Sequence, residues 1–184
     1  MNIFYLDKDP RVCAEYHVDK HVVKMILEYC QLLSTAHRII DGKESVEKKY
    51  VQGSLPARYR NVKHWILTDE RETTLYSATH INHPSAVWVR RSYENYVWLY
   101  QLFTELLKEY TYRYGKTHAC ARLVEDLYTP PTHIAKGIGF TEPTPAMPDD
   151  YKVPGNSIQS YKNYYLGDKQ RMFSWKNREK PSWV

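Results

Sequence analysis

The sequence lacks the long apolar runs and the cysteine patterns that mark several classes of protein. No uninterrupted apolar segment approaches the roughly 18 residues needed to cross a bilayer, and the chain does not open on a basic stretch followed by an apolar one. We therefore expect a protein that is neither membrane-spanning nor exported and that acts in the cytoplasm. The three cysteines are odd in number and form no Cys-x-x-Cys pair, so we expect reduced thiols rather than a disulfide framework or a thiolate zinc site.

Phenylalanine is also scarce, and the chain has no internal repeat. The chain has 4 Phe against 17 Tyr and 5 Trp, so most of its aromatic rings carry a polar edge. Such rings can form a tyrosine-rich core whose hydroxyls reach the rim, or they can stack on unpaired or flipped bases. The formal net charge of +5 fits an anionic partner without requiring one. With 184 residues and no repeat, we expect one domain over residues 1–184.

Apolar periodicity and capping residues predict an all-α fold. We expect about five helices, over residues 10–40, 69–79, 83–115, 117–127 and 157–175. Asp9-Pro10 marks the start of the first helix, Gly115 the end of the third, and Asn156 or Ser157 the start of the last. Six prolines between residues 129 and 155 predict a long loop within the domain, and the charged stretch 43–64 predicts a surface connection or a weak helix.

One face of the first helix carries a narrow polar stripe with apolar residues on both flanks. At about 100° per residue the stripe contains seven side chains, those of His17, His21, Lys24, Glu28, Gln31, Thr35 and Arg38. A stripe of this shape favours the lining of a cleft over open solvent, and a half-buried Glu28 can act there as a general acid or base. The alternative is an ordinary solvent-exposed pair of Lys24 with Glu28, one helical turn apart.

Two histidines of the stripe suggest a metal site, although their spacing alone is weak evidence. Imidazoles one turn apart, such as those of His17 and His21, can converge on one ion, with Asp19, His37, His80 or His83 completing the shell. The His-Glu-x-x-His pattern of zinc peptidases is absent. We therefore expect no metal and no cofactor, and a His-ligated metal enzyme remains an alternative.

Two further segments are candidates for contacting a nucleic acid. The first surrounds the predicted helix start at residues 80–85, where backbone N–H groups favour a phosphate; its candidates are His80, His83, Arg90 and Arg91. The second interleaves tyrosines with lysines near the C-terminus, in Tyr161, Lys162, Tyr164, Tyr165 and Lys169. Ordinary capping with a solvated arginine face explains the first segment equally well, and the edge of a core is an alternative for the second.

Short motifs at the two ends of the chain are typical of one family. In the first helix, Glu28 stands seven positions after His21 of Asp19-Lys20-His21, and Asp41-Gly42-Lys43 closes the helix. The segment 161–169 follows near the C-terminus. Together they resemble the phage endonuclease V type of pyrimidine-dimer DNA glycosylase. That family is small and mainly helical, and its N-terminal segment lies across the cleft between its helices. The chain also resembles a group of phage proteins without assigned activity that carry Asp-Lys-His-Val-Val-Lys-Met and Asn-His-Pro-Ser.

The resemblance implies roles for particular residues. Glu28 would assist cleavage of the glycosidic bond, His21 would lie near the DNA backbone, and the α-amino group would be the nucleophile that forms a Schiff base with the sugar. Asn2 is a poor second residue for removal of the initiator methionine, so this amine would belong to Met1. The family's arginines beside the glutamate are missing, which leaves Lys24 and Arg38 as substitutes. Tyr161, Lys162, Tyr164 and Tyr165 would engage the duplex.

The sequence thus predicts an enzyme that acts on DNA bases. It would be a DNA glycosylase, with or without cleavage of the strand at the abasic site, or a phage enzyme that modifies a base on the same scaffold and works in the host cytoplasm. DNA is the expected partner. The alternatives are a non-catalytic module that binds nucleic acid or a host protein, and the metal-dependent enzyme described above.

Overall fold

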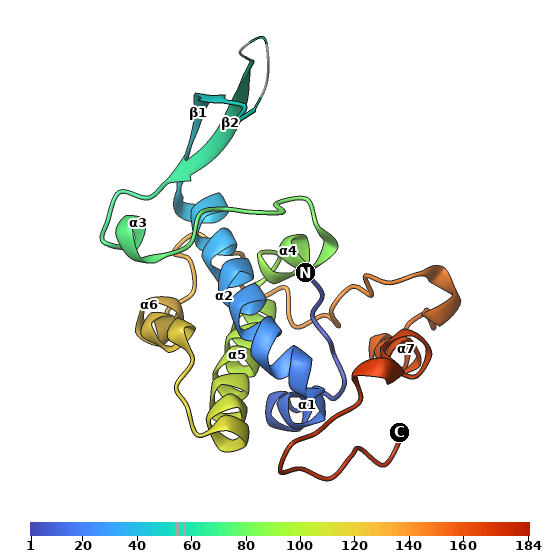
Figure 1. The fold of residues 1–184 in the computed structure, drawn as a ribbon. Helices are drawn as coiled ribbons and strands as arrows, with labels where there is room; N and C mark the ends of the chain where they lie inside the picture. The colour runs from blue at the N-terminus through green and yellow to red at the C-terminus, as the bar shows by residue number, and fades with distance from the viewer. Residues whose placement is uncertain (54–55, 57) are drawn as a thin grey trace.

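The computed structural model describes residues 1–53, 56 and 58–184, and two long helices dominate it (Figure 1). Helix α2 (Asp19–Asp41) and helix α5 (Tyr93–Tyr114) pack against each other, and the short α1 (Pro10–Tyr16) packs on α5. The N-terminal segment runs extended before α1, and its residues Ile3 to Leu6 are buried. One apolar core joins these elements; among its fully buried members are Ile3, Leu6, Ile26, Leu33, Leu99, Leu102, Phe103 and Leu106.

Shorter elements surround the two long helices. They are α3 (Arg71–Thr74), α4 (Pro84–Val89), a 3-10 turn (Ala119–Leu123) leading into α6 (Val124–Tyr128), a second 3-10 turn (Asp149–Tyr151) and α7 (Ser157–Tyr164). Helix α7 continues into one π-helical turn (Tyr165–Lys169) and a 3-10 turn (Gln170–Met172). No helix in the described part of the chain is long and apolar enough to cross a membrane.

Two of the predicted helices are each divided in the structure. The helix predicted over residues 10–40 breaks at His17 and Val18, whose backbones are extended, because the guanidinium of Arg113 binds the main-chain oxygen of His17. The helix predicted over residues 83–115 breaks before Ser92, whose hydroxyl caps α5 by accepting from the N–H of Asn95. The predicted stop at Gly115 is confirmed, since this glycine has a left-handed φ of 65°.

The prediction of an all-α fold is wrong, because residues 43–66 form a β-hairpin. Strand β1 (Lys43–Tyr50) pairs antiparallel with β2 (Tyr59–Ile66), in a register that places Tyr50 opposite Tyr59. Twelve of the sixteen strand residues are exposed, so the alternation of apolar and polar residues that reveals a half-buried strand is absent. Pairs across the strands stabilise it instead, including an ion pair of 2.7 Å between Glu44 and Lys63.

The loop predicted over residues 129–155 is confirmed, apart from its one 3-10 turn. Its first part is held by Asp41 at the end of α2, whose carboxylate accepts from the N–H groups of Thr132 and His133. The amide side chain of Asn156 caps α7 as predicted, by accepting from the N–H of Gln159. The helical turns after α7 end at Met172, close to the predicted end.

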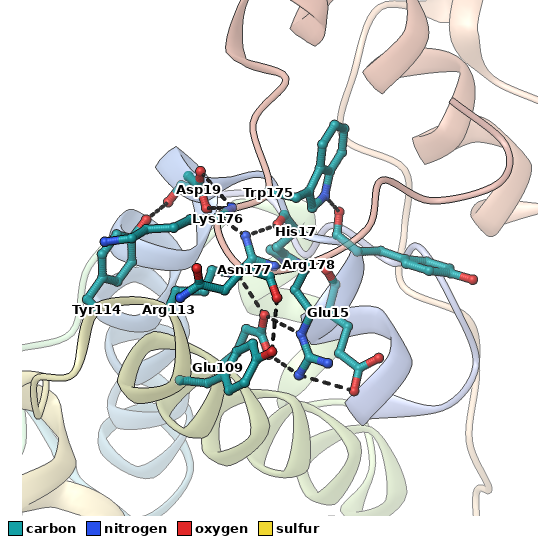
Figure 2. A network of polar contacts seen from close by, with 12 residues as sticks. Glu15, His17, Asp19, Glu109, Arg113, Tyr114, Trp175, Lys176, Asn177 and Arg178 are labelled. Carbon is teal, nitrogen blue, oxygen red and sulfur yellow. Dashed lines mark hydrogen bonds and ion pairs between the residues drawn. The ribbon is translucent and has the colours of Figure 1, made fainter.

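A network of charged side chains joins α1, α2, α5 and the C-terminal tail, as Figure 2 shows, and Arg113 and Glu109 at its centre are buried. Its ionic members, which we call the Arg113 network, are Glu15, Asp19, Glu109, Arg113 and Arg178. The Arg113 side chain is fully buried and donates to Glu109 at 2.6 Å and to Asp19 at 2.9 Å. It also donates to two main-chain oxygens, and Arg178 of the tail donates to Glu109 at 2.8 Å. The tail is thereby fixed against the two long helices.

Candidate active site

A cavity of about 350 Å³ opens where the N-terminal segment, α2 and the end of α7 meet, and we call it the Glu28 pocket. Its lining comprises Met1, Asn2 and Phe4 from the N-terminal segment; Lys20, His21, Lys24, Met25 and Glu28 from α2; Tyr164 at the end of α7; and Lys169, Arg171 and Met172 from the turns after it. His21, Lys24 and Glu28 share a helix face because they are three and four residues apart. The extended start of the chain lies beside this face, since Phe4 is buried among rings of α2 and α7.

The carboxylate of Glu28 lies between two cations. Its Oε2 is 3.6 Å from the α-amino nitrogen of Met1, and its Oε1 is 3.2 Å from the Nζ of Lys24. The Glu28 side chain is 15% exposed and that of Met1 is 6% exposed, whereas Lys24 is 70% exposed. A carboxylate and a primary amine are therefore adjacent inside a cavity, and the distance between them is longer than a hydrogen bond.

His21 is held in the wall of the pocket as a neutral imidazole. Its ring stacks on that of Phe4 with centroids 4.1 Å apart, and its Nδ1 lies 2.6 Å from the hydroxyl of Tyr165. Burial, and then the charges of His17, Lys169 and Lys24, lower the pKa of His21 to about 3. At neutral pH this histidine can accept or donate one hydrogen bond but carries no charge.

Tyr164 and Lys169 form the wall that faces α2. The Nζ of Lys169 lies over the Tyr164 ring, 4.3 Å from its centroid. The ring of Tyr164 is nearly parallel to that of Phe4, with an angle of 13° and centroids 6.5 Å apart. The ammonium of Lys169 therefore covers one face of this ring, and a planar ligand stacks on that face only when Lys169 moves aside, for example to a phosphate.

His80 and His83 belong to the electrostatic surroundings of the pocket rather than to its lining. Burial, and then the Met1 ammonium and His80, lower the pKa of His83, while Glu28 raises it. The Nδ1 of His83 accepts from the N–H of Ser85 at the start of α4. His80 has a left-handed φ of 49°, and its Nδ1 lies 2.7 Å from the hydroxyl of Thr79.

The structure thus unites six of the predicted site residues in the Glu28 pocket: Met1, His21, Lys24, Glu28, Tyr164 and Lys169. Tyr165 supports His21 from beneath, and Tyr161 is fully buried. Lys162 extends over the ring of Trp183, and Arg90 donates to the main-chain oxygen of Ile81. Arg91 is exposed beyond the end of α4.

Arg38 lies on the predicted stripe but not in the pocket. Its guanidinium donates to the carboxylate of Glu72 at 2.7 Å and to the main-chain oxygens of four residues in the segment 65–76, namely Trp65, Glu72, Leu75 and Tyr76. The single cleft expected along the stripe is therefore confined to its middle. The N-terminal end of the stripe is occupied by buried His17, and its C-terminal end lies under the segment 65–79.

The residues that sequence reasoning missed are Asn2, Phe4, Lys20, Met25, Arg171 and Met172. Phe4 belongs to a short apolar run, which indicates burial but not the surface against which it packs. The cations Lys20 and Arg171 carry no local signal that separates them from solvated charges. The only indication that residues before α1 line the site came from the resemblance, because the N-terminal segment of that family crosses a cleft.

The proposed histidine ligands of a metal are used otherwise. Both ring nitrogens of His17 are engaged, Nδ1 with the main-chain oxygen of Cys13 at 2.7 Å and Nε2 with the hydroxyl of Tyr29 at 2.9 Å. Within the residues described, no group of three or more His, Cys, Asp and Glu side chains is placed to hold an ion. The metal-dependent alternative therefore has no ligand set in this part of the chain.

Comparisons with protein-family models, with curated proteins and with solved structures return no match. The resemblance to the endonuclease V type of glycosylase therefore depends on the motifs of this sequence alone.

Proposed function

We propose that the protein is a DNA glycosylase whose catalytic groups are the α-amine of Met1 and the carboxylate of Glu28. The observation that carries this proposal is the separation of 3.6 Å between amine and carboxylate inside a cavity. An unprotonated amine is a nucleophile, and a carboxylate at this distance can take up the proton that the amine loses as it attacks.

The reaction follows from these two groups. The Met1 nitrogen attacks C1′ of the sugar, and the bond from C1′ to the base breaks with its electron pair leaving on the base, which is protonated by water. Glu28 accepts a proton from the attacking amine and donates it to the ring oxygen as the sugar opens, leaving a Schiff base between Met1 and C1′. Neutral His21 and the cation Lys24 remain at the wall, where they can contact the sugar and its phosphates.

The pocket also indicates the size and charge of the substrate. A cavity of about 350 Å³ is near the lower limit for ligand sites, so it suits one nucleotide turned out of a duplex rather than the duplex itself. Its lining contains four cationic side chains, those of Lys20, Lys24, Lys169 and Arg171, besides the α-amino group of Met1, against the single carboxylate of Glu28. Phosphates offset this excess of positive charge, and the ring of Tyr164 offers a face to the base.

The test is borohydride trapping on oligonucleotides that carry an abasic site, a pyrimidine dimer or a modified pyrimidine, with intact-mass analysis of the N-terminus. We expect a covalent adduct on the Met1 peptide. Glu28→Gln should lower base release by about 10²-fold or more while DNA binding is retained. The matched control is Glu105→Gln, which removes a carboxylate that also pairs with a lysine on a helix but lies outside the pocket.

Three outcomes would contradict parts of the proposal. Undiminished base release by Glu28→Gln removes the role of this carboxylate. If a chain whose α-amine is blocked by acetylation still releases the base without an adduct, water rather than the amine is the nucleophile. Tight DNA binding with neither base release nor an adduct leaves a base-modifying enzyme or a binding module on the same surface.

A further inference from the structure

The β-hairpin projects from the helical body beyond the end of α2 (Figure 1). Its base is fixed where Arg38 donates to the main-chain oxygen of Trp65. Gly42 permits the sharp exit from α2, because a Cβ there would lie 2.4 Å from the main-chain oxygen of Arg38 and 3.2 Å from the Cβ of Trp65. The side chains of Lys48, Lys49 and Tyr50 are exposed, so the outer part of the hairpin contributes little to the core.

The hairpin holds most of the net charge of the protein. Residues 43–66 contain six lysines and arginines against two glutamates, which is a net charge of +4 in a chain whose total is +5. Both glutamates are near the base, where Glu44 pairs with Lys63 at 2.7 Å and Glu47 lies 3.5 Å from His64. Glu47 also reaches Lys49 at 3.9 Å. The outer half, residues 48–60, has four cations and no acidic residue in its sequence: Lys48, Lys49, Arg58 and Arg60.

Aromatic rings accompany these cations. Tyr50 and Tyr59 are directly opposite each other, with ring centroids 5.8 Å apart. They are 50% and 67% exposed, respectively. Lys48 and Asn61 are also an opposed pair and share the face of the two tyrosines, since alternate residues of a strand point to the same side. This face therefore combines hydroxyl, amide and ammonium donors with no carboxylate beyond Glu44 at its base.

We propose that the outer ends of the two strands, Lys48 to Tyr50 and Tyr59 to Asn61, form an arm that binds in the major groove of duplex DNA. A two-stranded β-ribbon fits the major groove of B-form DNA, whereas the major groove of duplex RNA is too narrow and deep to be read in this way. Lys49 and Arg60, an opposed pair on the other face of the ribbon, contact the phosphates with their long side chains. The polar side chains of the tyrosine face reach the base edges. This arm takes its partner from the proposed function but uses none of the residues of the Glu28 pocket.

One duplex is long enough to meet both the arm and the pocket. Glu28 and the first residue of the hairpin, Lys43, are fifteen positions apart in the sequence. Along an α-helix this separation corresponds to about 22 Å, which is about six base pairs of DNA. The arm would hold the duplex some base pairs away from the nucleotide that enters the pocket, and it would increase affinity without touching the reacting atoms.

The experiment compares two triple variants that lose equal charge. Lys48→Gln with Lys49→Gln and Arg60→Gln removes three of the four cations of the hairpin's outer half, and Lys116→Gln with Lys136→Gln and Lys180→Gln neutralises three exposed lysines outside the hairpin. Fluorescence anisotropy gives the Kd for a 20-base-pair DNA duplex across a series of salt concentrations. We expect the arm variant to raise the Kd about 10-fold or more and to reduce the slope of log K against log salt by about 2 to 3, since each phosphate contact contributes about 0.9. The control variant should change both values much less.

Several results would overturn the inference. These are equal losses of affinity in the two variants, an unchanged Kd in the arm variant, and a loss on duplex RNA or on single strands as large as on duplex DNA. Thermal midpoints of both variants should match that of the unaltered protein, which shows that the fold is intact. Trapping on a short single-stranded oligonucleotide separates this inference from the proposed function. The arm variant should still form the adduct there, and Glu28→Gln should not.

Discussion

The Arg113 network and the Glu28 pocket both place a carboxylate of α2 beside cations, but they satisfy these charges differently. In the network, Asp19 accepts a hydrogen bond of 2.9 Å from the buried Arg113 and one of 3.0 Å from the N–H of Lys176 in the tail. In the pocket, Glu28 faces cations at 3.2 and 3.6 Å across an open cavity. Charges that are fully bonded to one another fix a fold, whereas charges held close without saturating each other remain available to a ligand.

The largest effect is expected from removal of the guanidinium at the centre of the Arg113 network. Arg113→Ala leaves Glu109, which is 3% exposed, with only one of its cations, and it leaves two main-chain oxygens without a donor. The free energy of unfolding should fall by about 3–5 kcal/mol. Urea denaturation at pH 7 measures this change. If the alanine variant fails to fold, Arg113→Lys should give an intermediate loss, and a loss below about 1 kcal/mol in either variant would refute the structural role.

Local signals explain how much of the fold the sequence could predict. Gly115, Asn156 and the prolines of the long loop act on the backbone within a few residues, and each of these predictions is confirmed. The break at His17 was not predictable, because it depends on a hydrogen bond from Arg113, 96 positions away. The hairpin escaped prediction because both of its faces are exposed, so apolar periodicity carries no information about it.

The same distinction applies to the candidate site. Helical periodicity alone predicted that His21, Lys24 and Glu28 share a face. It could not predict that Arg38, on the same stripe, turns toward the segment 65–76, since a stripe does not reveal what covers it. The position of Met1 beside Glu28 depends on tertiary packing, and only the family resemblance anticipated it.

The second effect is a loss of stability in mild acid, which also tests the contrast between buried and open groups. Burial, as the largest cause, lowers the pKa values of His17 and His37 to about 4 and that of His21 to about 3. The unfolded chain takes up protons near pH 6.5, but the folded chain does not do so until the pH reaches these lower values. Stability is therefore fully present above pH 6.5 and decreases as the pH falls toward 4. We expect a loss of about 2–4 kcal/mol at pH 5.5, from about 1.4 kcal/mol per histidine and pKa unit.

Urea midpoints at pH 7.5, 6.5, 5.5 and 4.5 measure this loss. The carboxylates contribute in a different window, because hydrogen bonds from Arg71, Thr132 and His133 outweigh burial and lower the pKa of Asp41 to about 2. Its contribution is present above pH 4 and is lost only below that value. His37→Gln should weaken the dependence between pH 6.5 and 5. A midpoint that stays constant from pH 7.5 to 5 would show that these imidazoles are not buried in solution.

The smallest effect on stability is expected for Glu28→Gln in the pocket. The same substitution at Glu109, in the Arg113 network, is its comparison. Glu28→Gln keeps the shape of the side chain and removes a charge that faces an open cavity, so water can replace it as a partner of Met1 and Lys24. The free energy of unfolding should change by no more than about 1 kcal/mol, as is usual for ion pairs that water can reach. Glu109→Gln removes a buried charge between Arg113 and Arg178, and it should cost several times more. Thermal and urea unfolding of both variants give the comparison directly.

If Glu28→Gln lowers the free energy of unfolding as much as Glu109→Gln does, Glu28 stabilises the fold as a member of a structural ion cluster. A deficit in base release by Glu28→Gln would then have to be attributed to unfolding rather than to chemistry.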